Sequence, residues 1–195
     1  MSVNILEKVQ QSLLYQPLQK VDANTQKVVV DSNTPNEDRF SQAAIPAAII
    51  AFYEFSTTEN GAGTILQMEA SSDWLSIIFG GEKDAFIKSI CSYANQPFQS
   101  CLNNIYAVFS ATLKAIREQL PATDNNNIEA VKNLLSDQRS SVLPYLPAEI
   151  QLGKLMDDST LDDRTNKMEG PMSNLMHTIG NVFSSSDEEK VENKY

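Results

Sequence analysis

Histidine, cysteine and long uncharged runs are scarce in this sequence. One histidine and two cysteines among 195 residues are too few for a disulfide framework or a paired zinc site. The most apolar run, residues 43–55, already contains Glu54, whereas a membrane-spanning helix needs about 20 apolar residues. Residues 1–20 also lack the unbroken apolar stretch of a secretory signal. These shortages argue against disulfide-rich, zinc-stabilised, membrane-spanning and exported proteins, and a cytoplasmic location is expected.

Basic residues are also in deficit. The 25 Asp and Glu residues exceed the 15 Lys and Arg residues, which gives a formal net charge of -10. A phosphate backbone is repelled by a net field of this sign unless a basic patch overrides it. We therefore expect no nucleic-acid partner. The hydrophobic fraction of 42% is enough for one core without disulfides or metal.

The two cysteines stand ten positions apart in a region that reads as helical. Ten residues of a continuous helix span about 15 Å, which no disulfide bridges. Cys91 and Cys101 are therefore expected to be reduced thiols, as is usual in a cytoplasm. The alternative is a redox pair that a break near Pro97 brings together.

Apolar residues recur at helical spacing along most of the chain. The clearest case predicts a helix of more than 20 residues at 98–120, near the centre of the fold. A first helix begins after Asn4, and an alanine-rich helix containing Pro46 spans about 36–57. Shorter helices are expected around Leu66 and at 71–81, 84–95, 128–144 and 147–156. The long stripe consists of Phe98, Leu102, Ile105, Phe109, Leu113, Ile116 and Leu120, and the first helix buries Ile5, Leu6, Val9, Leu13 and Leu14.

Together these segments predict an all-α fold, an irregular bundle of about seven to nine helices with a long central helix. Residues 1–156 form the bundle, and the structure of 21–36 is left open. Residues 157–183 comprise an acidic loop and an amphipathic helix at 171–183. Residues 184–195 are polar and are expected to be disordered.

No catalytic, cofactor-binding or metal-ligating residue can be assigned from the sequence. His177, the only histidine, lies beside Met176 and Ile179 on the last amphipathic segment, where a structural role is favoured. The glycines form no phosphate-binding loop, and no nucleophile elbow is present. Met156, Met168, Met172 and Met176 suit an adaptable docking surface, although a core role is favoured.

One stretch partly matches a calcium-binding loop. Oxygen-bearing side chains occupy five of the ligand positions of such a loop at residues 158–169. However, the position that requires glycine is Asp163, and Arg164 follows it. A solvated acidic linker is favoured, with calcium binding as the alternative. The oxygen-bearing residues are Asp158, Thr160, Asp162, Asn166 and Glu169.

Three stretches resemble the YidB-like family of bacterial proteins of unknown function. They are the opening Asn4-Ile5-Leu6, the alanine-rich segment 40–66 with its internal proline and Gly-Ala turn, and the Leu-Leu, Gln and Leu-Pro pattern of 131–155. The similarity spans about residues 3–156, without the polar stretch 21–36 and the tail after Asp157. It implies an all-α bacterial fold and carries no established activity.

The function predicted from these observations is that of a non-enzymatic bacterial interaction or structural protein. Its partner is an unidentified protein or a second copy of the chain. Two alternatives stay open: an enzyme whose site is assembled from dispersed residues, and a calcium-responsive protein that uses residues 158–169.

Overall fold

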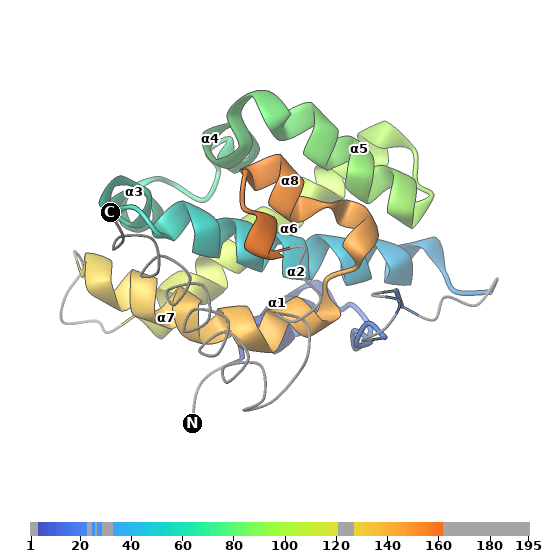
Figure 1. Cartoon of the computed structure of the whole chain (residues 1–195), viewed down its shortest axis with the longest axis horizontal. Coiled ribbons are helices and arrows are strands. Elements are labelled where there is room, and N and C mark those ends of the chain that lie inside the picture. The colour runs from blue at the N-terminus through green and yellow to red at the C-terminus, as the bar shows by residue number, and fades with distance from the viewer. Residues whose placement is uncertain (1–3, 23–24, 26, 29–32, 121–126, 162–195) are drawn as a thin grey trace, which may run out of the picture.

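Helices make up all the regular structure in the described part of the chain. The computed structural model describes residues 4–22, 25, 27–28, 33–120 and 127–161 (Figure 1). No strand occurs in these ranges, so the predicted all-α irregular bundle is confirmed. The α-helices are α1 (Ile5–Leu13), α2 (Asn36–Ser56), α3 (Glu59–Gln67), α4 (Trp74–Phe79), α5 (Lys83–Ala94), α6 (Phe98–Gln119), α7 (Ile128–Val142) and α8 (Leu152–Met156). The 3-10 helices are η1 (Gly80–Glu82), η2 (Leu143–Tyr145), η3 (Ala148–Ile150) and η4 (Ser159–Leu161).

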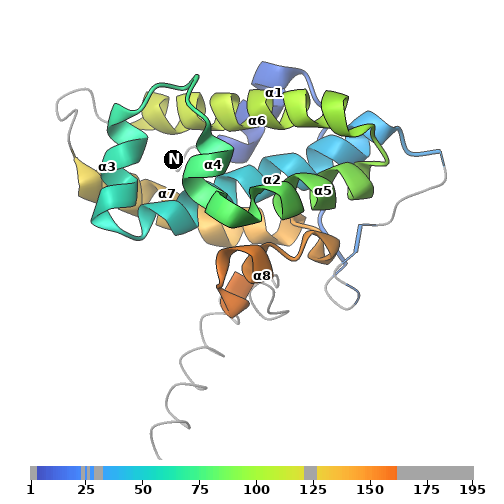
Figure 2. The same ribbon diagram turned by 90° about the horizontal axis from the view of Figure 1, so that it is seen from above.

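The centre of the bundle is α2. Every residue from Phe40 to Phe52 is buried, and no charged residue occurs between Arg39 and Glu54. A helix that is apolar all round belongs in an interior, because no face of it suits water. The other seven α-helices all contact α2, which lies between α6 and α7 in the view from above (Figure 2). A long central helix was predicted correctly, but it is α2 and not the helix at residues 98–120.

Helix starts follow the local sequence signals. The side chain of Asn4 accepts a hydrogen bond from the Glu7 amide at 3.3 Å, and that of Asn127 accepts one from the Ala130 amide at 2.8 Å. These caps satisfy amides that have no partner within the helix. The predicted starts of α1 and α7 are therefore confirmed. The predicted alanine-rich helix is also confirmed, since α2 continues through Pro46.

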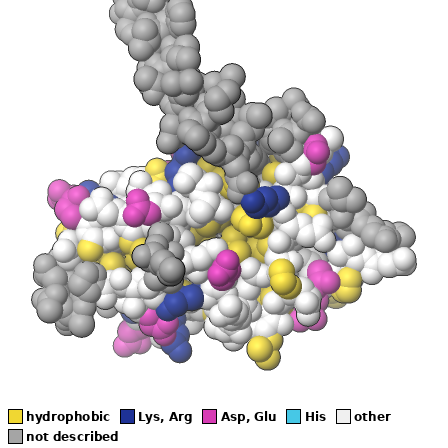
Figure 3. All heavy atoms as spheres, turned by 90° about the horizontal axis from the view of Figure 1, so that it is seen from below, with side chains coloured by type: hydrophobic (Ala, Val, Ile, Leu, Met, Phe, Trp, Pro, Cys, Tyr) yellow, Lys and Arg dark blue, Asp and Glu magenta, His cyan; other side chains and the backbone are white. Residues whose placement is uncertain are grey.

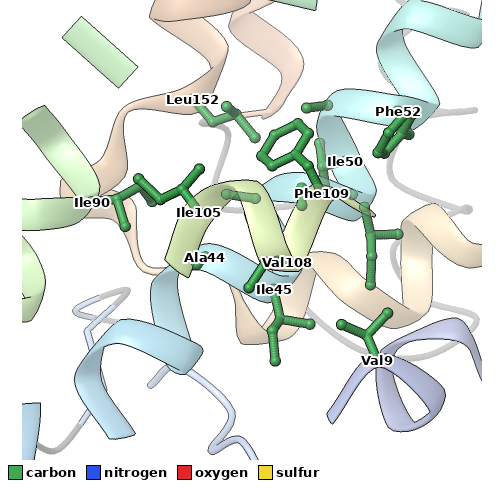
Figure 4. Packing of buried hydrophobic residues seen from close by; sticks show 14 of the residues in the cluster. Val9, Ala44, Ile45, Ile50, Phe52, Ile90, Ile105, Val108, Phe109 and Leu152 are labelled. Carbon is green, nitrogen blue, oxygen red and sulfur yellow. The ribbon is translucent and has the colours of Figure 1, made fainter. Parts of the chain in front are cut away.

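α6 covers the central helix with one face and leaves the other face exposed. Its side chain Phe109 is 1% exposed, and its ring centroid lies 5.6 Å from that of Phe52 and 5.8 Å from that of Phe86. Figure 4 shows residues of α1, α2, α5, α6 and α8 meeting in this core. Phe98 is 46% exposed, however, because it opens the helix at the edge of the bundle. The predicted stripe is therefore buried only in its middle.

Two buried glutamines form hydrogen bonds with backbone groups from distant parts of the chain. Gln42 accepts from the Gln19 amide at 2.8 Å and donates to the carbonyls of Gln19 at 2.9 Å and Tyr145 at 2.7 Å. Gln138 accepts from the amide of Ile5 at 3.0 Å. Buried polar groups need such partners, because an unpaired one costs about 1–3 kcal/mol. These bonds hold the stretch after α1 and the start of α1 against the bundle.

The expectation of two reduced thiols is wrong. Cys91 of α5 and Cys101 of α6 form a disulfide, with their Cα atoms 5.7 Å apart. The chain reverses at Asn95, which has a left-handed backbone, and α6 begins after Pro97. Because the helix is broken there, the two cysteines face each other across antiparallel helices instead of lying along one axis.

The core continues past the expected edge of the bundle at residue 156. Leu161 is fully buried and belongs to the same hydrophobic cluster as the helices. The amphipathic segment 171–183 and the tail 184–195 lie outside the described residues. None of the helices within the described ranges is both long and apolar enough to cross a lipid bilayer.

Replacing Phe109 with alanine tests the burial of the α6 stripe. The cavity and the lost apolar contacts are expected to lower the free energy of unfolding by about 3–5 kcal/mol. Phe98→Ala is the matched control on the same helix and is expected to cost under about 1 kcal/mol. Urea denaturation measures both values. Equal losses for the two variants would contradict the placement of α6.

The disulfide closes a loop of ten residues. Its reduction therefore increases the conformational entropy of the unfolded chain. Chain-entropy arguments give a loss of about 2–3 kcal/mol of stability for a loop of this length. Thermal denaturation with and without a reducing agent measures the effect on the wild type. The double variant Cys91→Ala, Cys101→Ala is the control and is expected not to respond. A wild type that melts identically in both conditions would show that the bond is absent.

Candidate functional site

The residues that the sequence singled out are only partly within the described ranges. His177, Asp162, Asn166 and Glu169 lie outside them. Of the calcium-type loop only Asp158 and Thr160 are described. Among the described residues, no three His, Cys, Asp or Glu side chains group closely enough to hold a metal ion. The candidates for a site within the described residues are therefore the polar clusters and hollows of the bundle.

A polar cluster joins α4, α5 and α6 around Asp73. This carboxylate accepts from Lys83 Nζ at 2.7 Å, from Ser76 Oγ at 2.6 Å and from Tyr106 Oη at 3.1 Å. Partial burial alone would raise the pKa of Asp73, but the hydrogen bonds from Lys83, Ser76 and Tyr106 together lower it. The hydrogen bond to Asp73 also raises the pKa of Lys83.

This cluster has the residues of a serine–lysine pair but not the chemistry. Lys83 Nζ lies 3.0 Å from Ser76 Oγ. A lysine that activates a hydroxyl must be neutral, which requires a lowered pKa. The shift at Lys83 has the opposite sign, so its ammonium group stays protonated. The cluster therefore has a structural role, in which its hydrogen bonds link α4, α5 and α6.

A second cluster contains two carboxyl groups. The charge of Asp158, in the turn after α8, acts on Glu54 of α2. Arg139 of α7 lies beside them, with its guanidinium 5.7 Å from the Tyr53 ring centroid and its Nη2 3.1 Å from Thr160 Oγ1. Burial first, and then the charge of Asp158, raise the pKa of Glu54 to about 7. We call these five residues the carboxyl cluster.

A groove of about 650 Å³ lies between α1 and α6. Small side chains of α6 line it, and polar side chains of α1 form the facing wall. A second hollow of about 320 Å³ extends it along α6 and shares Ala107 and Ser110 with it. We call the first hollow the α6 groove. Its α6 residues are Ala107, Ser110, Ala111, Lys114, Ala115 and Glu118, and its α1 residues are Lys8, Gln11, Ser12 and Leu13.

An exposed leucine ends α1 beside this groove. Leu14 follows the groove residue Leu13 and is 89% exposed, so the prediction that it lies on the buried face is wrong. Its φ of 59° is in the left-handed region, and the amides of residues 14 and 15 close the helix on the carbonyls of Gln11 and Gln10. Glycine or asparagine usually occupies this position, because the left-handed conformation costs other residues about 1–2 kcal/mol. The backbone reversal turns Leu14 away from the face that Ile5 and Val9 bury.

Charges around the groove are mixed. Glu118 Oε2 lies 3.5 Å from Lys8 Nζ, and its Oε1 lies 3.9 Å from Lys114 Nζ. Lys114 and Glu118 stand four residues apart, which is the usual spacing of an ion pair on a helix surface. Figure 3 shows that acidic and basic side chains also alternate with hydrophobic ones on the lower face of the molecule. Neither region has the single-sign field of a nucleic-acid interface.

One basic side chain of α6 serves to hold another helix. Arg117 reaches from α6 to the end of α3, where its Nε and Nη2 lie 2.9 and 2.7 Å from the Ile65 carbonyl oxygen. It also donates to the carbonyl of Met68. These bonds satisfy carbonyls that the end of a helix leaves free. No sequence motif marks this role, because the partners are backbone atoms of another helix.

Comparisons with known proteins add nothing to this description. No protein-family model, no curated protein and no solved structure matches the chain. The resemblance to the YidB-like family stays a prediction.

Proposed function

We propose that the chain is a non-enzymatic interaction protein that pairs with a second copy of itself through the α6 groove. The single observation that carries this proposal is the exposure of Leu14 next to a groove lined by small side chains. An exposed apolar side chain can anchor an interface, and a nearby groove can accept the same side chain of a partner.

The two features lie side by side on one surface, which favours a two-fold dimer. In a two-fold interface the same patch is used on both copies, so each element meets its complement on the other copy. The Leu14 of each copy then enters the groove of the other, over Ala107 and Ala111. Alanines allow two helices to approach closely, because their side chains occupy little space between the axes.

Charge also favours this surface over others for self-association. Two copies with a formal charge of -10 each repel one another over most of their surface. The groove residues include two lysines and one glutamate, so this region has a local positive excess. In a two-fold arrangement Glu118 of one copy can pair with Lys8 or Lys114 of the other.

The alternatives find less support among the described residues. An enzyme requires ionisable groups that converge on a cavity, whereas the charged side chains of the α6 groove form surface ion pairs among small and polar side chains. Calcium binding requires ligands that lie outside the described ranges. Membership of the YidB-like family and a bacterial origin remain parts of the proposal. A cytoplasmic location is the weaker part, because disulfides persist mainly in oxidising compartments.

Sedimentation velocity of the full chain over a range of protein concentrations tests the dimer. The wild type is expected to shift from monomer to dimer as concentration rises. Leu14→Asn is expected to remain monomeric and to fold at least as stably, because asparagine tolerates the left-handed backbone and Leu14 buries almost nothing in the monomer.

A second pair of variants on α6 separates the groove from a general charge effect. Ala107→Arg places a long side chain in the groove, whereas Asn103→Arg adds the same charge at an exposed position of α6 that does not line it. The first is expected to abolish the dimer and the second to leave it unchanged. A wild type that stays monomeric throughout, or a dimer unaffected by Leu14→Asn and Ala107→Arg, would overturn the proposal.

A further inference from the structure

The hollow that extends the α6 groove has the lining of a small-molecule pocket. It holds about 320 Å³, and pockets of about 300–1,000 Å³ that are lined by aromatic side chains and a few polar groups are typical ligand sites. None of its lining side chains carries a charge, although the chain has a formal net charge of -10. We call it the aromatic hollow. Two alanines line it together with three aromatic residues and three serines, which are Trp74, Tyr106, Phe109, Ser71, Ser72 and Ser110.

We propose that the aromatic hollow binds a small, uncharged aromatic molecule that carries a hydroxyl or an N–H group. The proposal goes beyond the dimer suggested above and does not depend on it, because every residue that lines the hollow belongs to one chain. The inner wall of the hollow, its rim and the charges around it each favour this class of ligand.

Two buried aromatic rings form the inner wall. Trp74 and Phe109 are each 1% exposed, and their ring centroids lie 5.3 and 5.6 Å from that of Phe52. The indole N–H of Trp74 donates to the Glu69 carbonyl at 3.0 Å, which fixes the orientation of the ring. Aromatic rings pack favourably against the face or edge of another ring. The wall is therefore formed before a flat apolar ligand arrives, and little ordering is needed on binding.

Hydroxyl groups lie at the rim of the hollow. Tyr106 Oη donates to Asp73 Oδ1 at 3.1 Å, and Ser71 Oγ donates to Glu69 Oε2 at 3.2 Å. A hydroxyl has one hydrogen, so these two oxygens can only accept a further hydrogen bond. A ligand with a hydroxyl or an N–H group supplies the matching donor, whereas an ether of the same shape does not.

The nearby charges disfavour an anionic ligand. The carboxylates of Asp73 and Glu69 each lie one hydrogen bond away from a rim hydroxyl. Lys83 is engaged with Asp73 at 2.7 Å, and its Nζ lies 5.7 Å from the Tyr106 ring centroid. Lys83 thus balances one carboxylate, and Glu69 adds a negative charge at the rim. A neutral ligand suits these surroundings better than a carboxylate or a phosphate, which the acidic side chains repel.

NMR titration of the isotope-labelled full chain with phenol, anisole and benzoate tests the class of ligand. The three probes share a benzene ring and differ in carrying a hydroxyl, an ether or a carboxylate. Trp74 is the only tryptophan, so its indole N–H gives a single signal that reports on the hollow. Phenol is expected to shift this signal to saturation. It is expected to bind at least about fivefold more tightly than anisole, which cannot donate a hydrogen bond, and more tightly than benzoate.

Two serine variants separate the hollow from the rest of the surface. Ser72→Phe places a ring in the hollow, so the saturable shift with phenol is expected to disappear. Ser92→Phe makes the same exchange at an exposed position of α5 that is not among the lining residues, and it is expected to bind phenol like the wild type. The amide spectrum of each variant verifies that it is folded.

The variant Leu14→Asn keeps this test distinct from the test of the dimer. It is expected to bind phenol like the wild type, because Leu14 does not line the aromatic hollow. Three results would each overturn the proposal: a Trp74 signal that phenol does not shift to saturation, equal affinities for the three probes, or a shift that persists in Ser72→Phe.

Discussion

The burial of α2 on all sides is the constraint on which the rest of the structure depends. Thirteen consecutive residues, Phe40 to Phe52, offer no polar face, so other helices must surround them. Each covering helix then needs only one apolar face. The outer face of α6 is consequently free to carry alanines and charges, and the proposed docking groove lies on it. The proposed function is thus a consequence of how the central helix is covered.

Periodicity predicts the helices well because each amphipathic face is a local property of the sequence. The caps at Asn4 and Asn127 and the buried middle of the α6 stripe, around Phe109, all follow from spacing and side-chain chemistry. Periodicity does not predict which helix is central. That position follows from the absence of charge between Arg39 and Glu54, which is a stronger signal than the regular spacing of the α6 stripe.

Two of the errors share one physical cause, which is a local reversal of the backbone. Cys91 and Cys101 are far apart along a single helix but adjacent when the chain turns back at Asn95. Leu14 continues the apolar pattern of α1, but a left-handed residue ends the helix there and directs the side chain to solvent. At Leu14 neither glycine nor asparagine marks the reversal. At Asn95 the asparagine and the nearby Pro97 do mark it, and a break there is the alternative that the sequence left open for the two cysteines.

The candidate sites could not be predicted from the sequence for a different reason. The carboxyl cluster joins Glu54 to Asp158 and Arg139 from distant parts of the chain, and the bonds of Gln42 and Gln138 are equally long-range. Single-sequence patterns carry no information about such pairs. Burial at the junction of α2, α7 and the turn after α8, together with the charge of Asp158, raises the pKa of Glu54, and neither effect can be read from the sequence around Glu54.

Residue-resolved native-state hydrogen exchange of α2 tests the central role of this helix most directly. If α2 is enclosed on every side, the amides from Ala47 to Phe52 exchange only through global unfolding. Their opening free energy then equals that from denaturant unfolding. An opening free energy for these amides lower than that of the α6 amides would contradict the account. A helix that opens before its neighbours cannot be the one that they surround.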